Sequence, residues 1–386
     1  MPYYKPIKDL SAAERKRTVA GIQRLRKQFA DMRFPSKKAS ESLILGTWNI
    51  RNFDDDRFNY GPRLKESLHY IAEILSRFDV VAVQEICSDL APLNRLMGLL
   101  GQQYDYIMTD VTHSGLGGNK ERLGFIYDRN KVGFKGVAGE IVLPDKMLIG
   151  GSPDKKRQFS RTPFGVEFQA GWFKFLFLTV HIYYGNASKT SPEYARRVKE
   201  IDAVAKYLAK EAKASSSNQI LVGDFNILKP GSAGFNALVK NGFTMVHNRM
   251  GSNRDQTKFY DQISFRSRKN VLVQMEPDRD DRVFQFFDSV FRADDFSTYK
   301  PIIQKSLKEK LEKAEEDLAA ATSKTEKKKA KDQIASLNAA GASEASLEEY
   351  YDEWRTFQMS DHLPLWVELE IDFSDEYLEY LSTYQA

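Results

Sequence analysis

ILVGDFNI, residues 220–227, is a short apolar run that ends in glycine, aspartate and asparagine. A run of this length, rich in branched apolar residues, favours a buried β-strand. The interior of such a strand has no use for a carboxylate or an amide, so Asp224 and Asn226 are candidates for chemistry at the strand's end. GDFN alone could also be a turn with a side-chain hydrogen bond to the backbone, so the neighbouring segments decide the interpretation.

Three other segments have the same form, an apolar strand with carboxylate, amide or imidazole groups at its end: TWNIRNF (47–53), VVAVQEI (80–86) and LTVHI (178–182). A fifth segment, MSDHLP (359–364), precedes strand-like sequence at 365–371. Each segment is a weak signal by itself. Their joint occurrence in one chain is much more specific, and it predicts that the strand ends hold the chemistry.

The chain around these segments alternates short strands with helical patterns. We expect strands near 44–50, 80–85, 124–127, 173–181 and 219–225. Between the last two, Ser191 and Pro192 start a helix with an apolar face of Ala195, Val198, Ile201, Ala205 and Leu208. Strands with interspersed helices indicate a layered α/β or α+β domain.

Both flanks of this pattern are helical. Residues 11–33 have capping-box spacing at Ser11 and Glu14 and carry many arginines and lysines, which could contact phosphates but more often form a solvated face. We therefore assign 1–42 to a basic N-terminal helical arm. Within the catalytic domain at 43–386, the Lys/Glu/Ala-rich stretch 299–340 predicts an inserted hairpin of two helices joined near 322–325.

Composition limits the class of protein but not its substrate. Hydrophobic residues make up 42% and charged residues 28% of 386, which is typical of a folded globular protein. The 57 basic residues barely exceed the 53 acidic ones, so a polyanion site would need local clustering. The start lacks an apolar leader and no run reaches about 18 apolar residues, so we expect a cytoplasmic protein with no membrane partner. The single cysteine, Cys87, excludes an internal disulfide and is expected to be buried.

Eight segments, in the order in which they follow along the chain, resemble the endonuclease/exonuclease/phosphatase superfamily, and among its branches the deoxyribonuclease I type. They are WNIR (48–51), FDVVAVQE (78–85), KERLGFIYDRNKV (120–132), FSRTP (159–163), TVHI (179–182), GDFN (223–226), YDQI (260–263) and SDHLP (360–364). The resemblance implies a four-layered α/β sandwich, two packed β-sheets flanked by helices, with the active site at one edge. It also implies a metal-dependent phosphodiesterase, foremost a DNA endonuclease.

Chemistry and resemblance together suggest roles for the polar residues. Oxygen ligands suit Mg²⁺, with Mn²⁺ or Ca²⁺ as alternatives, and the metal candidates are Glu85, Asn49 and Asp361. By resemblance, Glu121 orients His181 and Asp261 orients His362. We assign His362 to water activation and His181 to the phosphate or leaving oxygen, although the two roles could be exchanged. Asp224 and Asn226 are expected near the phosphorus, and Arg161 and Asn226 on phosphate oxygens.

The resemblance is incomplete. Cys87 stands where deoxyribonuclease I has an arginine that enters the minor groove, and the disulfides of the secreted enzymes are absent. The same kind of metal site also serves phosphatases and phospholipases, including those for phosphoinositides and sphingomyelin, so these remain alternatives to a nuclease. A second alternative is a non-catalytic scaffold that uses the helical hairpin. The hairpin could also bind a protein partner.

Overall fold

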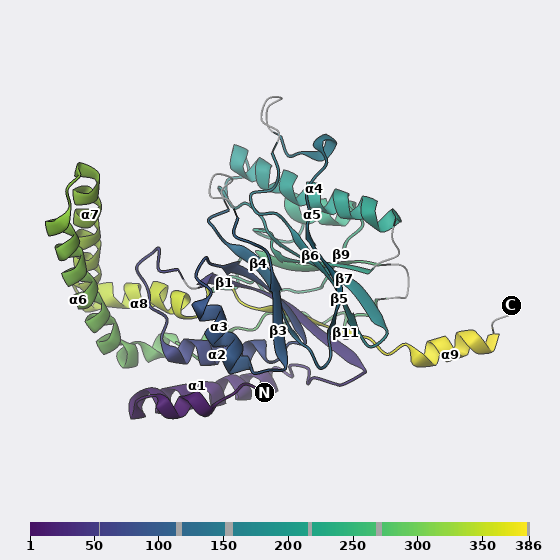
Figure 1. Ribbon diagram of the computed structural model, residues 1–386, viewed down its shortest axis with the longest axis horizontal. Coiled ribbons are helices and arrows are strands. Elements are labelled where there is room, and N and C mark those ends of the chain that lie inside the picture. Colours follow the sequence, from purple (N-terminus) through teal and green to yellow (C-terminus); the bar gives the residue numbers. More distant parts are fainter. Residues whose placement is uncertain (54, 113–117, 151–156, 215–217, 268–271, 384–386) are drawn as a thin grey trace.

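The computed structural model describes residues 1–386 except 54, 113–117, 151–156, 215–217, 268–271 and 384–386. Two mixed β-sheets pack face to face, and helices cover their outer faces (Figure 1). The first sheet has the strand order β11-β1-β2-β4-β3. Its strands are β1 (Ser42–Phe53), β2 (Val80–Ile86), β3 (Tyr104–Met108), β4 (Arg122–Asp128) and β11 (Leu365–Glu370). Only β1 and β2 run parallel among these pairs of described strands.

The second sheet has the order β5-β6-β7-β8-β10-β9, and β7 and β8 form its parallel pair. Its strands are β5 (Gly133–Glu140), β6 (Phe164–Ala170), β7 (Phe173–His181), β8 (Asn218–Asp224), β9 (Thr244–Met245) and β10 (Asp261–Arg266). All five strands expected from the sequence are present, with ends that differ by a few residues.

Alternation along β7 explains how the sheet separates two cores. Phe175 and Phe177 point toward the first sheet, where Phe177 lies 4.9 Å from the ring of Phe125 on β4. Leu178 and Val180 point the other way, into a separate cluster with the helices that cover the second sheet. Because side chains alternate with a period of two, the strand's last residues keep this division.

Helices complete the four layers. On the side of the first sheet lie α1 (Ala12–Asp31), α2 (Lys65–Leu75) and α3 (Ala91–Leu100), and on that of the second α4 (Pro192–Ala214) and α5 (Ala233–Lys240). Short 3₁₀ turns are η1 (Lys5–Asp9), η3 (Asp145–Met147), η4 (Phe286–Asp288) and η5 (Ala293–Asp295). The expected four-layered sandwich is confirmed.

The N-terminal helix α1 packs along α2, and its Leu25 and Phe29 are buried in the main core. The predicted capping box of Ser11 is present. Its basic face is not wholly solvated, however, because arginines pair with buried carboxylates of α2. Arg17 lies 2.9 Å from Glu66, and Arg26 lies 3.0 Å from Glu73.

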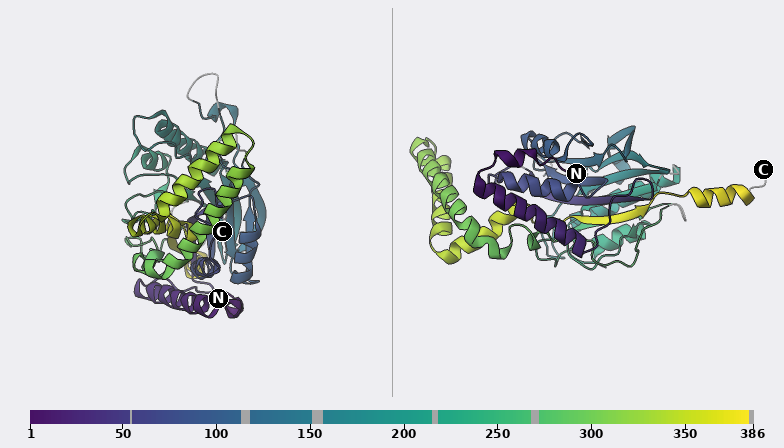
Figure 2. Two further views of the ribbon diagram at one scale, coloured as in Figure 1. Left: turned by 90° about the vertical axis from the view of Figure 1, so that its left-hand side faces the viewer. Right: turned by 90° about the horizontal axis from the view of Figure 1, so that it is seen from below.

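The helices α6 (Phe296–Ala320) and α7 (Lys324–Gly341), expected as an inserted hairpin, pack on each other and stand beside the sandwich (Figures 1 and 2). A third helix that was not predicted from the sequence, α8 (Glu344–Gln358), packs against the end of β1 and leads the chain to β11. The last helix, α9 (Ser374–Thr383), extends from the opposite side in Figure 1. None of the described helices combines the length and apolarity needed to cross a membrane.

Candidate active site

Three strands of the second sheet bring polar residues into one row. The parallel register of β7 and β8 places His181 opposite Asp224, and the antiparallel register of β10 places Asp261 on the other side of Asp224. His181 shares the parity of Phe175 and Phe177, so it faces the first sheet. The row therefore lies between the two sheets, at the edge where β7 and β8 end.

The first sheet supplies the facing groups. Asn49 on β1 donates from Nδ2 to Oε1 of Glu85 at 3.0 Å and to Oδ2 of Asp224 at 3.2 Å. One amide thus joins a carboxylate of each sheet. Directly below, Gln84 donates to Thr179 Oγ1 across the same interface at 2.8 Å. These polar contacts fix the separation of the sheets beneath the site.

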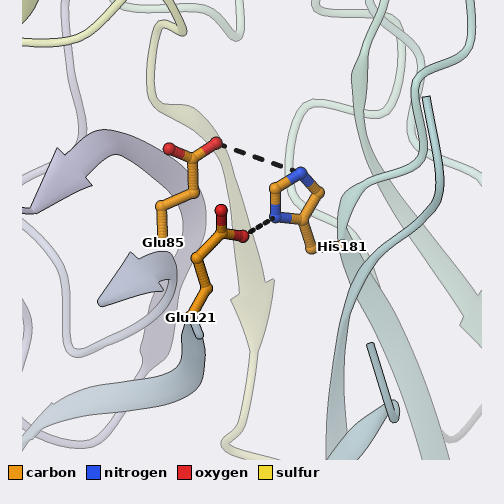
Figure 3. Close-up of side chains that lie close together, drawn as sticks. All are labelled: Glu85, Glu121 and His181. Carbon is orange, nitrogen blue, oxygen red and sulfur yellow. Dashed lines mark ion pairs between the residues drawn. The ribbon is translucent and has the colours of Figure 1, made fainter. Parts of the chain in front are cut away.

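His181 lies between two glutamates of the first sheet's edge (Figure 3). Its Nδ1 is 3.2 Å from Glu121 Oε2, and its Nε2 is 3.9 Å from Glu85 Oε1. The Nδ1 contact is within ion-pair distance, although it is not aligned as a hydrogen bond. Glu121 is the carboxylate expected to orient this imidazole.

Glu121 also holds a buried arginine. Arg161 Nε lies 2.7 Å from Glu121 Oε2, and both side chains are almost fully enclosed. Burial alone would raise the pKa of Glu121, but His181 and Arg161 outweigh it and lower the pKa to about 2. Arg161, expected to contact a substrate phosphate, pairs with this carboxylate through its Nε.

The second histidine has a matching arrangement. His362, in the loop before β11, lies with Nδ1 2.8 Å from Asp261 Oδ2 and Nε2 3.8 Å from Asp224 Oδ2. Burial lowers its pKa, but Asp261 and then Asp224 raise it, and the net result lies well above the ordinary histidine value. Two carboxylates therefore make this imidazole strongly basic.

Backbone conformations at the site are unusual. Glu85, Asn52 and Asn226 have φ values of 62°, 43° and 53°, in the left-handed region that few non-glycine residues occupy. The amide of Asn52 donates to Glu85 Oε2 at 2.8 Å, which helps to hold that carboxylate. Gly223 has φ of 127°, and an added Cβ would lie 2.1 Å from the carbonyl oxygen of Val180. Only glycine fits there, one residue before Asp224.

Carboxylates outnumber cations around the two imidazoles, and their arrangement fits a metal ion. The described residues include two groups able to hold one: Glu85, Glu121 and His181, and Asp224, Asp261 and His362. Asn49 Oδ1 and Asp261 Oδ1 are buried without a hydrogen-bond partner within the described structure. Oxygen donors and orphaned buried oxygens suit a hard divalent cation, which would also allow a phosphate to approach this acidic edge.

Two other predicted residues lie near but not in these groups. Asn226 donates from Nδ2 to Ile182 O at 2.8 Å, and its backbone amide donates to Asp224 Oδ1 at 2.8 Å. It therefore supports the end of β8 as well as bordering the site. Asp361 is half-buried and outside both metal-binding groups, and its charge contributes to the raised pKa of His362.

A buried arginine beneath the site, Arg197, was not predicted from the sequence. Arg197 on α4 donates to Asn226 O at 2.9 Å, Tyr184 O at 3.1 Å and Asn186 O at 2.7 Å. It ties together the loops that follow β7 and β8, and its burial lowers its pKa. Its place beside the apolar stripe of α4 was the only sequence signal.

Two other residues were missed. Glu200, also on α4, accepts from Ser160 Oγ at 3.1 Å and from the amide of Tyr183 at 3.3 Å, so it joins the FSRTP segment to the end of β7. The ring of Tyr260 lies 5.4 Å from that of His362. Burial raises the pKa of Tyr260 to about 12, so it is a neutral hydrogen-bond donor at the site. YDQI contains this tyrosine, and the motif could have suggested it.

The chain is similar to known proteins in sequence and in structure. A model of the Endonuclease/Exonuclease/phosphatase family matches residues 46–268. Human (Homo sapiens) Deoxyribonuclease-1 is 28% identical over 194 residues, which cover 48% of this chain and 61% of the relative. The dog (Canis lupus familiaris) protein of that name is 29% identical over 194 residues, covering 48% and 60%. The chain thus spans about three fifths of the length of these curated relatives.

Among solved structures, an endonuclease/exonuclease/phosphatase family protein from Bacteroides thetaiotaomicron has a TM-score of 0.49 and 16% sequence identity. That comparison covers 86% of this chain and 99% of the other.

Proposed function

The chain belongs to the endonuclease/exonuclease/phosphatase family, and we propose that it is a metal-dependent phosphodiesterase that cuts DNA. The family match confirms the resemblance seen in the sequence motifs. The similarity to deoxyribonuclease-1 favours DNA over the phosphoinositide and sphingomyelin alternatives. A scaffold without activity is disfavoured because the carboxylates and imidazoles needed for hydrolysis are all present.

One observation carries the proposal: two carboxylate-held histidines converge on Asp224. His181 Nε2 lies 3.4 Å and His362 Nε2 lies 3.8 Å from Asp224 Oδ2. The other ring nitrogen, Nδ1, faces Glu121 in His181 and Asp261 in His362. Such an arrangement suits in-line displacement at a phosphorus, where one group takes a proton from water and another stabilises the leaving oxygen.

The residues then divide the work. His362, whose pKa Asp261 and Asp224 raise, accepts the proton of the attacking water once it has lost its own. His181, held by Glu121, serves the phosphate or the leaving oxygen. Asp224 positions the water, and Asn226 borders the phosphate. Glu85 and Asn49 would hold Mg²⁺, with Asp361 as a further candidate ligand, and the ion would neutralise phosphate charge when bound.

The experiment is a substrate screen with and without a divalent cation. Plasmid DNA, single-stranded DNA, RNA, a phosphoinositide and sphingomyelin are each incubated with the protein in Mg²⁺ or in chelator. We expect Mg²⁺-dependent cleavage of DNA that leaves a 5′-phosphate and a 3′-hydroxyl. Hydrolysis of the lipid substrates alone would replace the nuclease with a phosphatase or phospholipase.

A further inference from the structure

The loop that follows β1 is held by residues of α6 and α8. On α6, Lys310 Nζ donates to Asn59 O and lies 3.6 Å from Asp56 Oδ2. On α8, Tyr350 donates from its hydroxyl to the same Asn59 oxygen at 3.0 Å, and its ring lies 5.2 Å from that of Tyr60. The helices α6 and α8 therefore fix residues 55–61, which lie between the end of β1 and α2.

This loop brings an arginine to the active site. Arg57 Nη1 lies 3.7 Å from Glu121 Oε1, the carboxylate that holds His181. Its Nη2 donates to Asp55 Oδ2 at 3.1 Å and to Asn119 O at 3.5 Å. The guanidinium of Arg57 therefore lies beside Glu121, at the border of the active site.

Exposure separates the two arginines that contact Glu121. The side chain of Arg161 is 7% exposed and enclosed beside the carboxylate, whereas that of Arg57 is 26% exposed. The next residue, Phe58, is 53% exposed, and the guanidinium of Arg51 lies 5.7 Å from its ring. Of the two arginines, Arg57 can reach an incoming phosphate without leaving Glu121 unpaired, because Arg161 remains there.

We propose that Arg57 binds a backbone phosphate of the nucleic acid beside the one that is cut, and that Lys310 of α6 and Tyr350 of α8 position it. This inference rests on the proposed phosphodiesterase function and assigns part of its substrate specificity. The insertion then acts on the substrate through the loop at 55–61. The proposed role of these helices is to position the guanidinium of Arg57, and they take no part in the chemical step.

Binding without cleavage tests the arginine directly. A short fluorescein-labelled DNA is titrated in chelator, with fluorescence anisotropy as the readout, at several salt concentrations. Arg57→Ala should weaken binding roughly tenfold and reduce the salt slope by about one, and Arg57→Lys should restore most of the slope. The matched control is Arg129→Ala, at the far end of β4, whose contact with Asp105 spans 3.9 Å. Equal binding by Arg57→Ala and the wild type would overturn the proposal.

A double-mutant cycle tests the positioning. Lys310→Met and Tyr350→Phe should each weaken DNA binding in the wild type but have little effect in the Arg57→Ala background, because both act through the loop. Lys308→Met, an exposed position on the same helix, is the control and should leave binding unchanged. Additive losses would show that Lys310 and Tyr350 do not act through Arg57, and that part of the proposal would fail.

Hydrolysis measured in parallel separates the two hypotheses. Arg57-dependent binding by a protein that cleaves none of the screened substrates would contradict the proposed function and leave the phosphate site standing. The opposite result is Mg²⁺-dependent cleavage by the wild type, with Arg57→Ala changing neither DNA binding nor KM. It would support the proposed function and contradict the phosphate site at Arg57.

Discussion

Asp224 links the two halves of the site, because both imidazole Nε2 atoms and the amide of Asn49 lie within 4 Å of its Oδ2. Such a shared carboxylate makes the groups interdependent. Loss of any one changes the charge and the orientation of the others, so single substitutions are not expected to report separate contributions.

Substitution of the converging residues should therefore be severe and non-additive. His181→Ala, Asp224→Ala and His362→Ala should each lower kcat by about 10²- to 10⁴-fold, because groups that transfer protons typically contribute that much. The triple variant should be little worse than the worst single one. Turnover by any single variant close to that of the wild type, in protein shown by circular dichroism to be folded, would remove that residue from the mechanism.

Glu85 should control the response to metal. Glu85→Gln keeps an acceptor for the amide of Asn52 but removes the charge that faces the cation. We expect a loss of about 3 kcal/mol of transition-state stabilisation, roughly a hundredfold in rate. Mg²⁺ should raise the melting temperature of the wild type but not of Glu85→Gln. The control is Glu309→Gln on the exposed face of α6, which should respond to Mg²⁺ as the wild type does.

Among the secondary-structure elements, α4 supports the site from outside the second sheet. One face packs Ile201, Val204 and Leu208 against the sheet, while Arg197 and Glu200 reach the loops after β7 and β8. A helix of this kind both closes the core and sets the position of catalytic loops.

Arg197→Met should thus lower stability and activity together. It leaves the buried carbonyl oxygen of Asn226 and the partly buried ones of Tyr184 and Asn186 without their donor, at a cost of about 3 kcal/mol in the free energy of unfolding. The loops after β7 and β8 should shift, and a misplacement of about 1 Å can cost roughly a hundredfold in rate. Lys206→Met, at an exposed position of the same helix, is the control. Unchanged kcat in folded Arg197→Met would show that these loops keep their positions without the arginine.

On α2, buried His69 gives a pH dependence of stability that is separate from the site. Burial lowers the pKa of His69 to about 4, below its ordinary value near 6.5. As the pH falls below 6.5 the unfolded chain takes up a proton that the folded chain cannot, so stability declines until about pH 4 and then levels off. The full loss in the free energy of unfolding that is due to His69 is about 3 kcal/mol.

Urea unfolding at about pH 7.5 and about pH 5 measures this loss. The change in unfolding free energy between these two pH values should be smaller in His69→Gln than in the wild type. The same pH dependence in both proteins would assign the acid sensitivity to other groups.

Over the whole molecule, the insertion has two parts. Its base belongs to the main core, where Ile303 and Leu307 are buried, and it holds the loop at 55–61. Beyond Ala314 and Ala330, the helices α6 and α7 extend as a tip with lysines at 324, 327, 328 and 329, and Lys331 lies directly below it. A basic tip could contact a phosphate backbone or an acidic protein surface.

Deletion of the tip alone tests that role. Residues 315–329 are replaced by a short Gly/Ser linker, which keeps Lys310 and the buried base. We expect normal hydrolysis of a small diester but weaker binding of long DNA, or loss of a protein association, with a smaller salt dependence. If affinity, salt slope and associations all stay unchanged, the tip is a spacer.

The site residues at strand ends could be predicted from the sequence. A buried apolar strand does not need a carboxylate or an imidazole for packing, so Asp224 and His181 indicated a functional role. Helix α8 was missed although Leu347, Tyr351 and Trp354 have helical spacing, because a short aromatic and acidic stretch gave a weak pattern. Arg57 could not be found from the sequence, because its position depends on residues of α6 and α8 about 250 or more positions away in the chain.

The most direct test of the account is the rate of DNA cleavage in Mg²⁺ and in chelator, for the wild type and His362→Ala side by side. The account predicts cleavage by the wild type in Mg²⁺, none in chelator, and a rate about 10²- to 10⁴-fold lower in His362→Ala. Full cleavage in chelator, or equal rates for the two proteins in Mg²⁺, would contradict it.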